Sequence, residues 1–113
     1  MHEMSITQSI VAAVADKLPD VRVVGVRLEI GTLAGVVVDS VRFCFDLVTE
    51  GTNLAGARLR IDQPGGRFRC RACSAEFDHD DLLAVCECGS VDVAVLAGTE
   101  LRIKSVEVAA GVG

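Results

Sequence analysis

Hydrophobic residues recur at helical spacing near the start of the chain. Four of them lie four residues apart, a fifth lies beside them, and Pro19 follows. Positions three or four residues apart share one face of a helix, and a proline disfavours its continuation. The pattern predicts an amphipathic helix over residues 5–18, with a buried stripe of Ile6, Ile10, Val11, Val14 and Leu18.

Three later segments alternate between apolar and polar or small residues, which is typical of half-buried strands. The first runs from Val24 to Ile30, the second covers residues 58–61, and the third begins at Leu101. In the third, the alternation slips by one position at Ser105, which predicts a β-bulge.

A second helix is predicted between the first two strands. Asp39 is a plausible N-cap residue, and Gly51 marks the end of the segment. The expected buried stripe is Val41, Cys44, Phe45 and Val48. Cys44 is therefore expected to be a core residue, because free cysteine is among the most buried residue types.

The segment between the second and third strands contains four cysteines and follows a break at Pro64, Gly65 and Gly66. It reads as a module of residues 67–97 inserted between two strands of one sheet. The predicted fold class is α+β: a small mixed sheet with two helices, and an inserted domain like a zinc ribbon.

The inserted segment carries two close pairs of cysteines. Cys70 and Cys73 form a CxxC motif, and Cys86 and Cys88 form a second, tighter pair. Four soft thiolates select zinc, with iron as the chemical alternative, and leave no open position for substrate. We predict a structural zinc site, with His79 as the substitute ligand if the CxC spacing keeps one cysteine away.

The first residues offer a different set of metal ligands. His2 brings its imidazole near the amine of Met1, and the intervening backbone nitrogens complete a ring of nitrogen donors. Such donors suit a square-planar ion, which indicates Ni(II) or Cu(II). From chemistry alone, the alternative reading is that His2 is an exposed residue on a frayed chain end.

Composition narrows the class of protein. The 113 residues carry a net charge of −5, which disfavours general nucleic-acid binding. No export signal and no long apolar run is evident, so we expect a cytoplasmic protein without a membrane span. In that compartment, five cysteines favour metal binding over disulfides. The sequence contains no phosphate-binding loop and no evident nucleophile with a partner base, so it gives little support to an enzyme.

Three stretches resemble the HypA/HybF family of hydrogenase nickel-insertion proteins. They are MHEMSITQSI, GTLAGVVVDSVRFCFDLVTEGT and the cysteine pairs followed by GS. The resemblance covers essentially the whole chain. It departs from the family pattern at Cys86 and Cys88, where two residues commonly separate the second pair.

The resemblance implies a nickel-binding domain of residues 1–66 and 98–113 and a zinc domain of residues 67–97. It implies that His2 binds Ni(II) with the Met1 amine and backbone nitrogens, that Glu3 is a neighbouring acidic position, and that the four paired cysteines hold Zn(II). The implied partners are a HypB-type GTPase, the large subunit of [NiFe]-hydrogenase and, in some organisms, the urease maturation proteins.

Two rival functions remain at this point. One is a zinc-ribbon module that binds nucleic acid or protein and has no nickel function, for which Arg67, Arg69 and Arg71 are the best evidence. The other is a redox protein that uses CxxC as a dithiol, or a rubredoxin-like iron centre.

Overall fold

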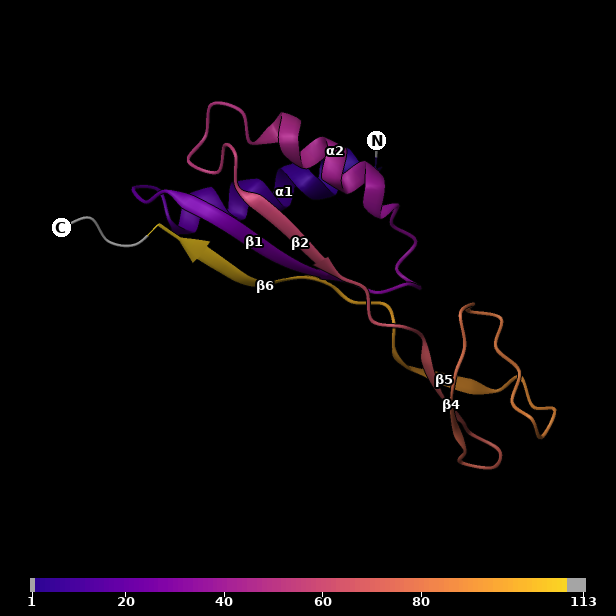
Figure 1. Cartoon of the computed structure of the whole chain (residues 1–113). Helices are drawn as coiled ribbons and strands as arrows, with labels where there is room; N and C mark the ends of the chain where they lie inside the picture. The colour runs from indigo at the N-terminus through magenta and orange to yellow at the C-terminus, as the bar shows by residue number, and fades with distance from the viewer. Residues whose placement is uncertain (1, 110–113) are drawn as a thin grey trace. The chain divides into compact units, whose positions relative to one another are not determined.

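The computed structural model describes residues 2–109 and divides into two compact units, both visible in Figure 1. The N-terminal unit consists of the described residues up to Leu28, Val36–Ile61 and those from Arg102 onward. The cysteine unit consists of Glu29–Gly35 and Asp62–Leu101. The second unit thus takes in a loop that the predicted boundaries left in the first. The functional assignment of the two parts stays a prediction.

The first helix, α1, covers His2–Lys17 and begins earlier than the sequence pattern predicted. Val11 and Val14 on its predicted stripe are buried, whereas Ile6, Ile10 and Leu18 are half-buried. The stripe also contains Thr7, which is buried and donates a hydrogen bond of 2.6 Å to the carbonyl oxygen of Glu3. That bond satisfies a hydroxyl that would otherwise be costly to bury.

The second helix, α2, covers Val38–Val48, and the predicted N-cap was wrong. Val37 occupies the N-cap position without a side-chain capping bond of its own, and Asp39 lies inside the first turn. The reason is that another element supplies the acceptor: the Glu3 carboxylate accepts a hydrogen bond of 3.1 Å from the Val37 N–H. Asp39 still favours the helix, because negative charge is stabilising near a helix N-terminus.

The buried face of α2 is largely as predicted. Val41, Cys44 and Phe45 are buried and Val48 is half-buried, so Cys44 is a core residue. Within residues 2–109, neither helix is long and apolar enough to span a membrane.

A three-stranded sheet of order β2-β1-β6 completes the N-terminal unit. Its strands are β1 (Val23–Ile30), β2 (Arg58–Asp62) and β6 (Leu101–Val108). Figure 1 shows β1 and β2 running in one direction and β6 in the other, with both helices on the same face. The parallel pair follows from the connection through α2, since parallel neighbours need a crossover.

The apolar side of this sheet follows the predicted alternation in β1, where Val26, Leu28 and Ile30 are buried. In β6 the half-buried residues are Ile103 and Val106, three positions apart, as a slip in the alternation requires. The bulge inferred from that slip stays a prediction.

The cysteine unit contains a second three-stranded sheet of order β4-β3-β5, which the sequence pattern did not predict. The strands are β3 (Arg67–Cys70), β4 (Glu76–Asp78) and β5 (Val93–Ala97), and β3 pairs antiparallel with both neighbours. Its buried apolar cluster is small: Leu33, Phe68 and Ala84, with Phe77 and Val93 packed against it.

Three glycines allow the strands that enter and leave the cysteine unit to approach closely. A Cβ atom on Gly31 would lie 1.9 Å from the Gly98 carbonyl oxygen, and one on Gly66 would lie 2.2 Å from the His79 carbonyl oxygen. Hydrogen bonds join the same segments, including Leu33 N–H to the Gly98 carbonyl at 2.7 Å. Glycine is therefore required where these backbones meet.

Neighbouring glycines provide a test of this packing. We expect Gly66→Ala to destabilise the protein by about 1–3 kcal/mol, because its Cβ would meet backbone that cannot yield easily. Gly65→Ala is the matched control, since a Cβ there meets nothing within 4 Å. Thermal denaturation followed by circular dichroism measures both, and equal melting temperatures for the two variants would contradict the close approach.

Candidate metal sites

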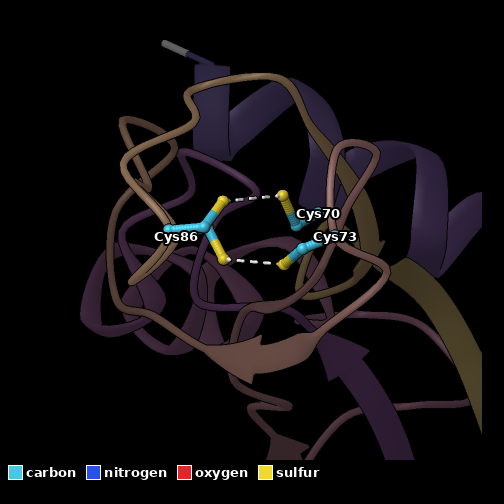
Figure 2. Close-up of side chains that lie close together, drawn as sticks. Cys70, Cys73 and Cys86 are labelled. Atoms are coloured by element: carbon cyan, nitrogen blue, oxygen red, sulfur yellow. Dashed lines mark hydrogen bonds between the residues drawn. The ribbon is translucent and has the colours of Figure 1, made fainter.

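The four paired cysteines form one cluster, in which all four sulfur atoms lie within 4.8 Å of one another. The Sγ atoms of Cys70 and Cys88 are 3.6 Å apart, and so are those of Cys73 and Cys86. Figure 2 shows the side chains of Cys70, Cys73 and Cys86 turned toward a common space. Each short contact joins one cysteine pair to the other, so the cluster holds two separate loops together.

These distances fit a tetrahedral metal ion. A zinc ion with bonds of about 2.3 Å to four sulfurs separates the sulfurs by about 3.8 Å. A disulfide requires about 2.05 Å, and all four cysteines are free. The donor set and spacing therefore suit zinc held by four thiolates and do not suit paired disulfides.

The two cysteine turns are built alike, although the second pair has the tighter CxC spacing. In the first, Cys70 N–H donates to the Ala75 carbonyl at 2.8 Å, and Ser74 N–H donates to the Cys70 carbonyl at 2.9 Å. In the second, the Cys86 N–H donates to the Ser90 carbonyl at 3.0 Å, and the Gly89 N–H donates to the Cys86 carbonyl at 2.8 Å. The second turn keeps the same pair of bonds with one residue fewer.

A residue with positive φ closes each turn after its second cysteine. Ser74 has φ of 66° and Gly89 has φ of 90°. Glycine adopts this conformation without strain, whereas a serine there is uncommon. The shorter turn therefore still delivers Cys88 to the cluster.

The thiols differ in acidity. Backbone N–H groups of Cys73 and Ala72 point at the Cys70 sulfur and lower its pKa to about 6. At Cys86 the backbone N–H of Cys88 also favours the thiolate, but burial and hydrogen bonds with neighbouring thiols outweigh it and raise the pKa to about 12. Four adjacent thiols cannot all ionise without a cation, so metal binding must release protons.

His79 lies outside the group of sulfurs that could hold a metal within residues 2–109. Its ring stands edge-on to Phe68, with ring centroids 6.4 Å apart. Its Nδ1 atom lies 3.1 Å from the backbone nitrogen of Asp81. The ring is thus engaged within the exposed acidic turn, and the structure brings Cys88 to the cluster in its place.

The three arginines of the rival nucleic-acid hypothesis are all paired with carboxylates. Arg67 lies 2.8 Å from Asp78 and 3.6 Å from Glu76, and its pKa is raised, chiefly by the hydrogen bond to Asp78. Arg69 lies 3.2 Å from Glu76. Arg71 lies 2.9 Å from Asp92. These side chains form ion pairs with neighbouring carboxylates instead of an open basic patch.

The nitrogen donors expected at the chain start lie at the beginning of α1. His2 is the first residue of the helix and is exposed, whereas Met1 lies outside the described residues. The first N–H groups of a helix have no partner within it. The backbone nitrogens of the first turn are therefore not committed to helix hydrogen bonds.

Glu3 connects the first turn of α1 to the start of α2. Its Oε2 atom accepts the bond from the Val37 N–H, and this bond is the main reason that the pKa of Glu3 is lowered. The carboxylate also borders an open depression of about 520 Å³ that Met4, Phe43 and Cys44 help to line. The structure thus gives Glu3 a definite partner, which sequence reasoning did not find.

Comparison with known proteins identifies the family. The family model described as "Hydrogenase/urease nickel incorporation, metallochaperone, hypA" matches residues 1–108. This chain belongs to the HypA family. Membership makes it a hydrogenase maturation factor and not an enzyme.

Individual relatives agree over nearly the full length. The HypA of Nostoc punctiforme is 45% identical over 108 residues, covering 96% of both chains. That of Geotalea uraniireducens is 49% identical over 109 residues, covering 96% of this chain and 99% of its own. Both relatives are described as hydrogenase maturation factor HypA.

Two solved HypA structures share the fold. The solution structure of the Ni metallochaperone HypA from Helicobacter pylori is 25% identical, with a TM-score of 0.64 over 96% of this chain and 98% of its own. A second HypA solution structure is 28% identical, with a TM-score of 0.70 over 98% of both chains. The α+β prediction is therefore confirmed.

Sequence reasoning missed Leu33 as well as the partner of Glu3. Leu33 lies in the loop after β1, yet it belongs to the apolar cluster of the cysteine unit. The only signal is a leucine between Gly31 and Gly35, where no periodicity marks it as a core position.

Substitutions at three positions test the composition of the cluster. We expect Cys88→Ser to lower the bound zinc of purified protein, because one of four soft donors is lost. His79→Ala and Cys44→Ala should retain one zinc ion per chain. Elemental analysis measures the content, and loss of zinc in His79→Ala with retention in Cys88→Ser would contradict the four-cysteine assignment.

Proposed function

We propose that this chain binds Ni(II) at its N-terminus and delivers it during [NiFe]-hydrogenase maturation, while a separate zinc ion stabilises the cysteine unit. The observation that carries the proposal is the separation of two unlike donor sets. His2 starts a helix in the N-terminal unit, and the four sulfurs gather in the cysteine unit. Borderline Ni(II) suits the nitrogen donors, and thiolates suit zinc.

The proposed nickel site uses the His2 imidazole, the Met1 amine and backbone nitrogens of the opening residues. It is supported by the exposure of His2 and by the unengaged N–H groups of the first helical turn. The positive end of the α1 dipole lies there and disfavours a cation. A small, exposed site of this kind holds nickel loosely, as a protein that hands nickel on requires.

Glu3 is assigned to positioning in this proposal. Its bond to the Val37 N–H fixes the first turn of α1 against α2. Its negative charge next to His2 also offsets part of the helix dipole, which favours a bound cation nearby. Glu3 thereby holds the proposed donors in place and tunes their affinity for nickel.

Zinc in the cysteine unit is assigned a structural role. Cys70, Cys73, Cys86 and Cys88 would fill all four positions of a tetrahedral ion, so no site remains for water or substrate. The buried apolar cluster of that unit has few members. We therefore propose that zinc supplies much of the free energy that folds these loops.

The proposed partners are those of the family: a HypB-type GTPase, the hydrogenase large subunit and, in some organisms, urease maturation proteins. The free thiols fit a cytoplasmic protein, where cysteines stay reduced. The alternative, a zinc-ribbon module without nickel function, loses its best support because Arg67, Arg69 and Arg71 are paired with carboxylates.

Nickel titration of untagged protein tests this proposal. We expect His2→Ala to abolish nickel binding in calorimetry, because the imidazole donor is lost, and to retain one zinc ion per chain. His79→Ala is the matched control, since it removes the chain's other histidine and should bind nickel as the wild type does. Equal nickel binding by all three proteins would contradict the proposal and favour the zinc-ribbon alternative.

A further inference from the structure

The sheet of the N-terminal unit carries a pocket that the metal sites do not use. It has a volume of about 390 Å³, and its lining includes Gly25, Arg27, Arg58, Arg60, Ser105 and Glu107. Val26 also lines the pocket, but the other lining positions alternate with apolar residues of the same strands, such as the buried Leu28. The pocket therefore lies on the face of the sheet opposite the apolar core.

Small residues form the floor of this pocket. Gly25 lies in the middle of β1, where glycine is unfavourable and often marks a bulge, a bend or a close approach by a ligand or another backbone. A Cβ atom on Gly25 would lie 3.2 Å from Oε1 of Glu107. Ser105 of β6 is a second small residue in the lining. Larger side chains at these positions would fill the hollow.

Arginines form the walls. Three arginines and one glutamate line the pocket, in a chain whose net charge is −5. Arg58 and Arg60 are exposed, and among residues 2–109 no ion pair joins either of them to a carboxylate. Arg67, Arg69 and Arg71 of the cysteine unit, in contrast to Arg58 and Arg60, are paired with carboxylates. The pocket is thus a local concentration of positive charge on an acidic protein.

We propose that this pocket binds an acidic, extended segment of a partner protein through two carboxylates on alternate residues. Arg58 and Arg60 lie two residues apart on one face of β2, so their Cα atoms are separated by about 6.6 Å. Alternate side chains of an extended peptide repeat at the same distance. Arginine also matches a carboxylate with two parallel hydrogen bonds.

A peptide fits this surface better than a nucleic acid does. The described lining contains no aromatic side chain on which a base could stack. The negative charge of the whole chain opposes a long phosphate backbone, whereas a short segment with two carboxylates meets only the arginines. Recognition by this pocket is independent of the proposed nickel and zinc roles.

The test uses the full, zinc-loaded chain and a fluorescent peptide of alternating glutamate and valine. We expect binding by anisotropy at low salt, and chemical-shift changes at the amides of Gly25, Arg58, Arg60 and Ser105 in the NMR spectrum. The double variant Arg58→Ser/Arg60→Ser should bind about tenfold or more weakly. Arg69→Ser/Arg71→Ser, which removes the same charge from the other unit, should bind within about twofold of wild type.

A control peptide has glutamine in place of glutamate and therefore distinguishes recognition of the carboxylates from non-specific binding of an extended peptide. We expect this control peptide not to bind. Equal binding of the two peptides would overturn the proposal, as would equal weakening by the two double variants. A single-stranded oligonucleotide that binds more tightly than the acidic peptide, and loses affinity in Arg58→Ser/Arg60→Ser, would show that the pocket takes phosphate backbones instead.

Discussion

The convergence of four sulfur atoms is the interaction on which the cysteine unit depends. Its two cysteine turns have similar hydrogen bonds and are separated by residues 74–85, and both sulfur contacts of 3.6 Å join one turn to the other. The apolar cluster around Phe68 is small. In the proposed structural role, a zinc ion at the centre would remove the mutual repulsion of the thiolates and crosslink the two turns, so that metal binding would stabilise the fold of this unit.

The N-terminal unit depends on more familiar forces. Each of the two helices buries an apolar stripe against one face of a mixed sheet, and the Glu3 carboxylate ties the first turn of α1 to the start of α2. The loop after β1 contributes residues to both units. Leu33 packs in the core of the cysteine unit, and the Val37 N–H of the N-terminal unit donates a hydrogen bond to Glu3. A short stretch of chain thus links the residues beside the proposed nickel site to the core of the cysteine unit.

Much of this could be predicted from local patterns. The helical stripe around Val11 and Val14, the alternation in β1 and the burial of Cys44 all follow from periodicity, because each depends on neighbours close in sequence. The cap of α2 could not be predicted, since its acceptor lies 34 residues away in Glu3. The strands of the cysteine unit are short and mostly exposed, so their alternation carries little signal. Cys88 joins the cluster through a tight turn, and the geometry of that turn could not be predicted from the CxC spacing alone.

The central claim is that one chain keeps two metals on chemically different donors. X-ray absorption spectra at the nickel and zinc edges of a single sample, loaded with one equivalent of each metal, test it most directly. The account predicts that zinc has four sulfur neighbours at about 2.3 Å and that nickel has only nitrogen or oxygen neighbours. Sulfur at nickel, or nitrogen replacing sulfur at zinc, would contradict it.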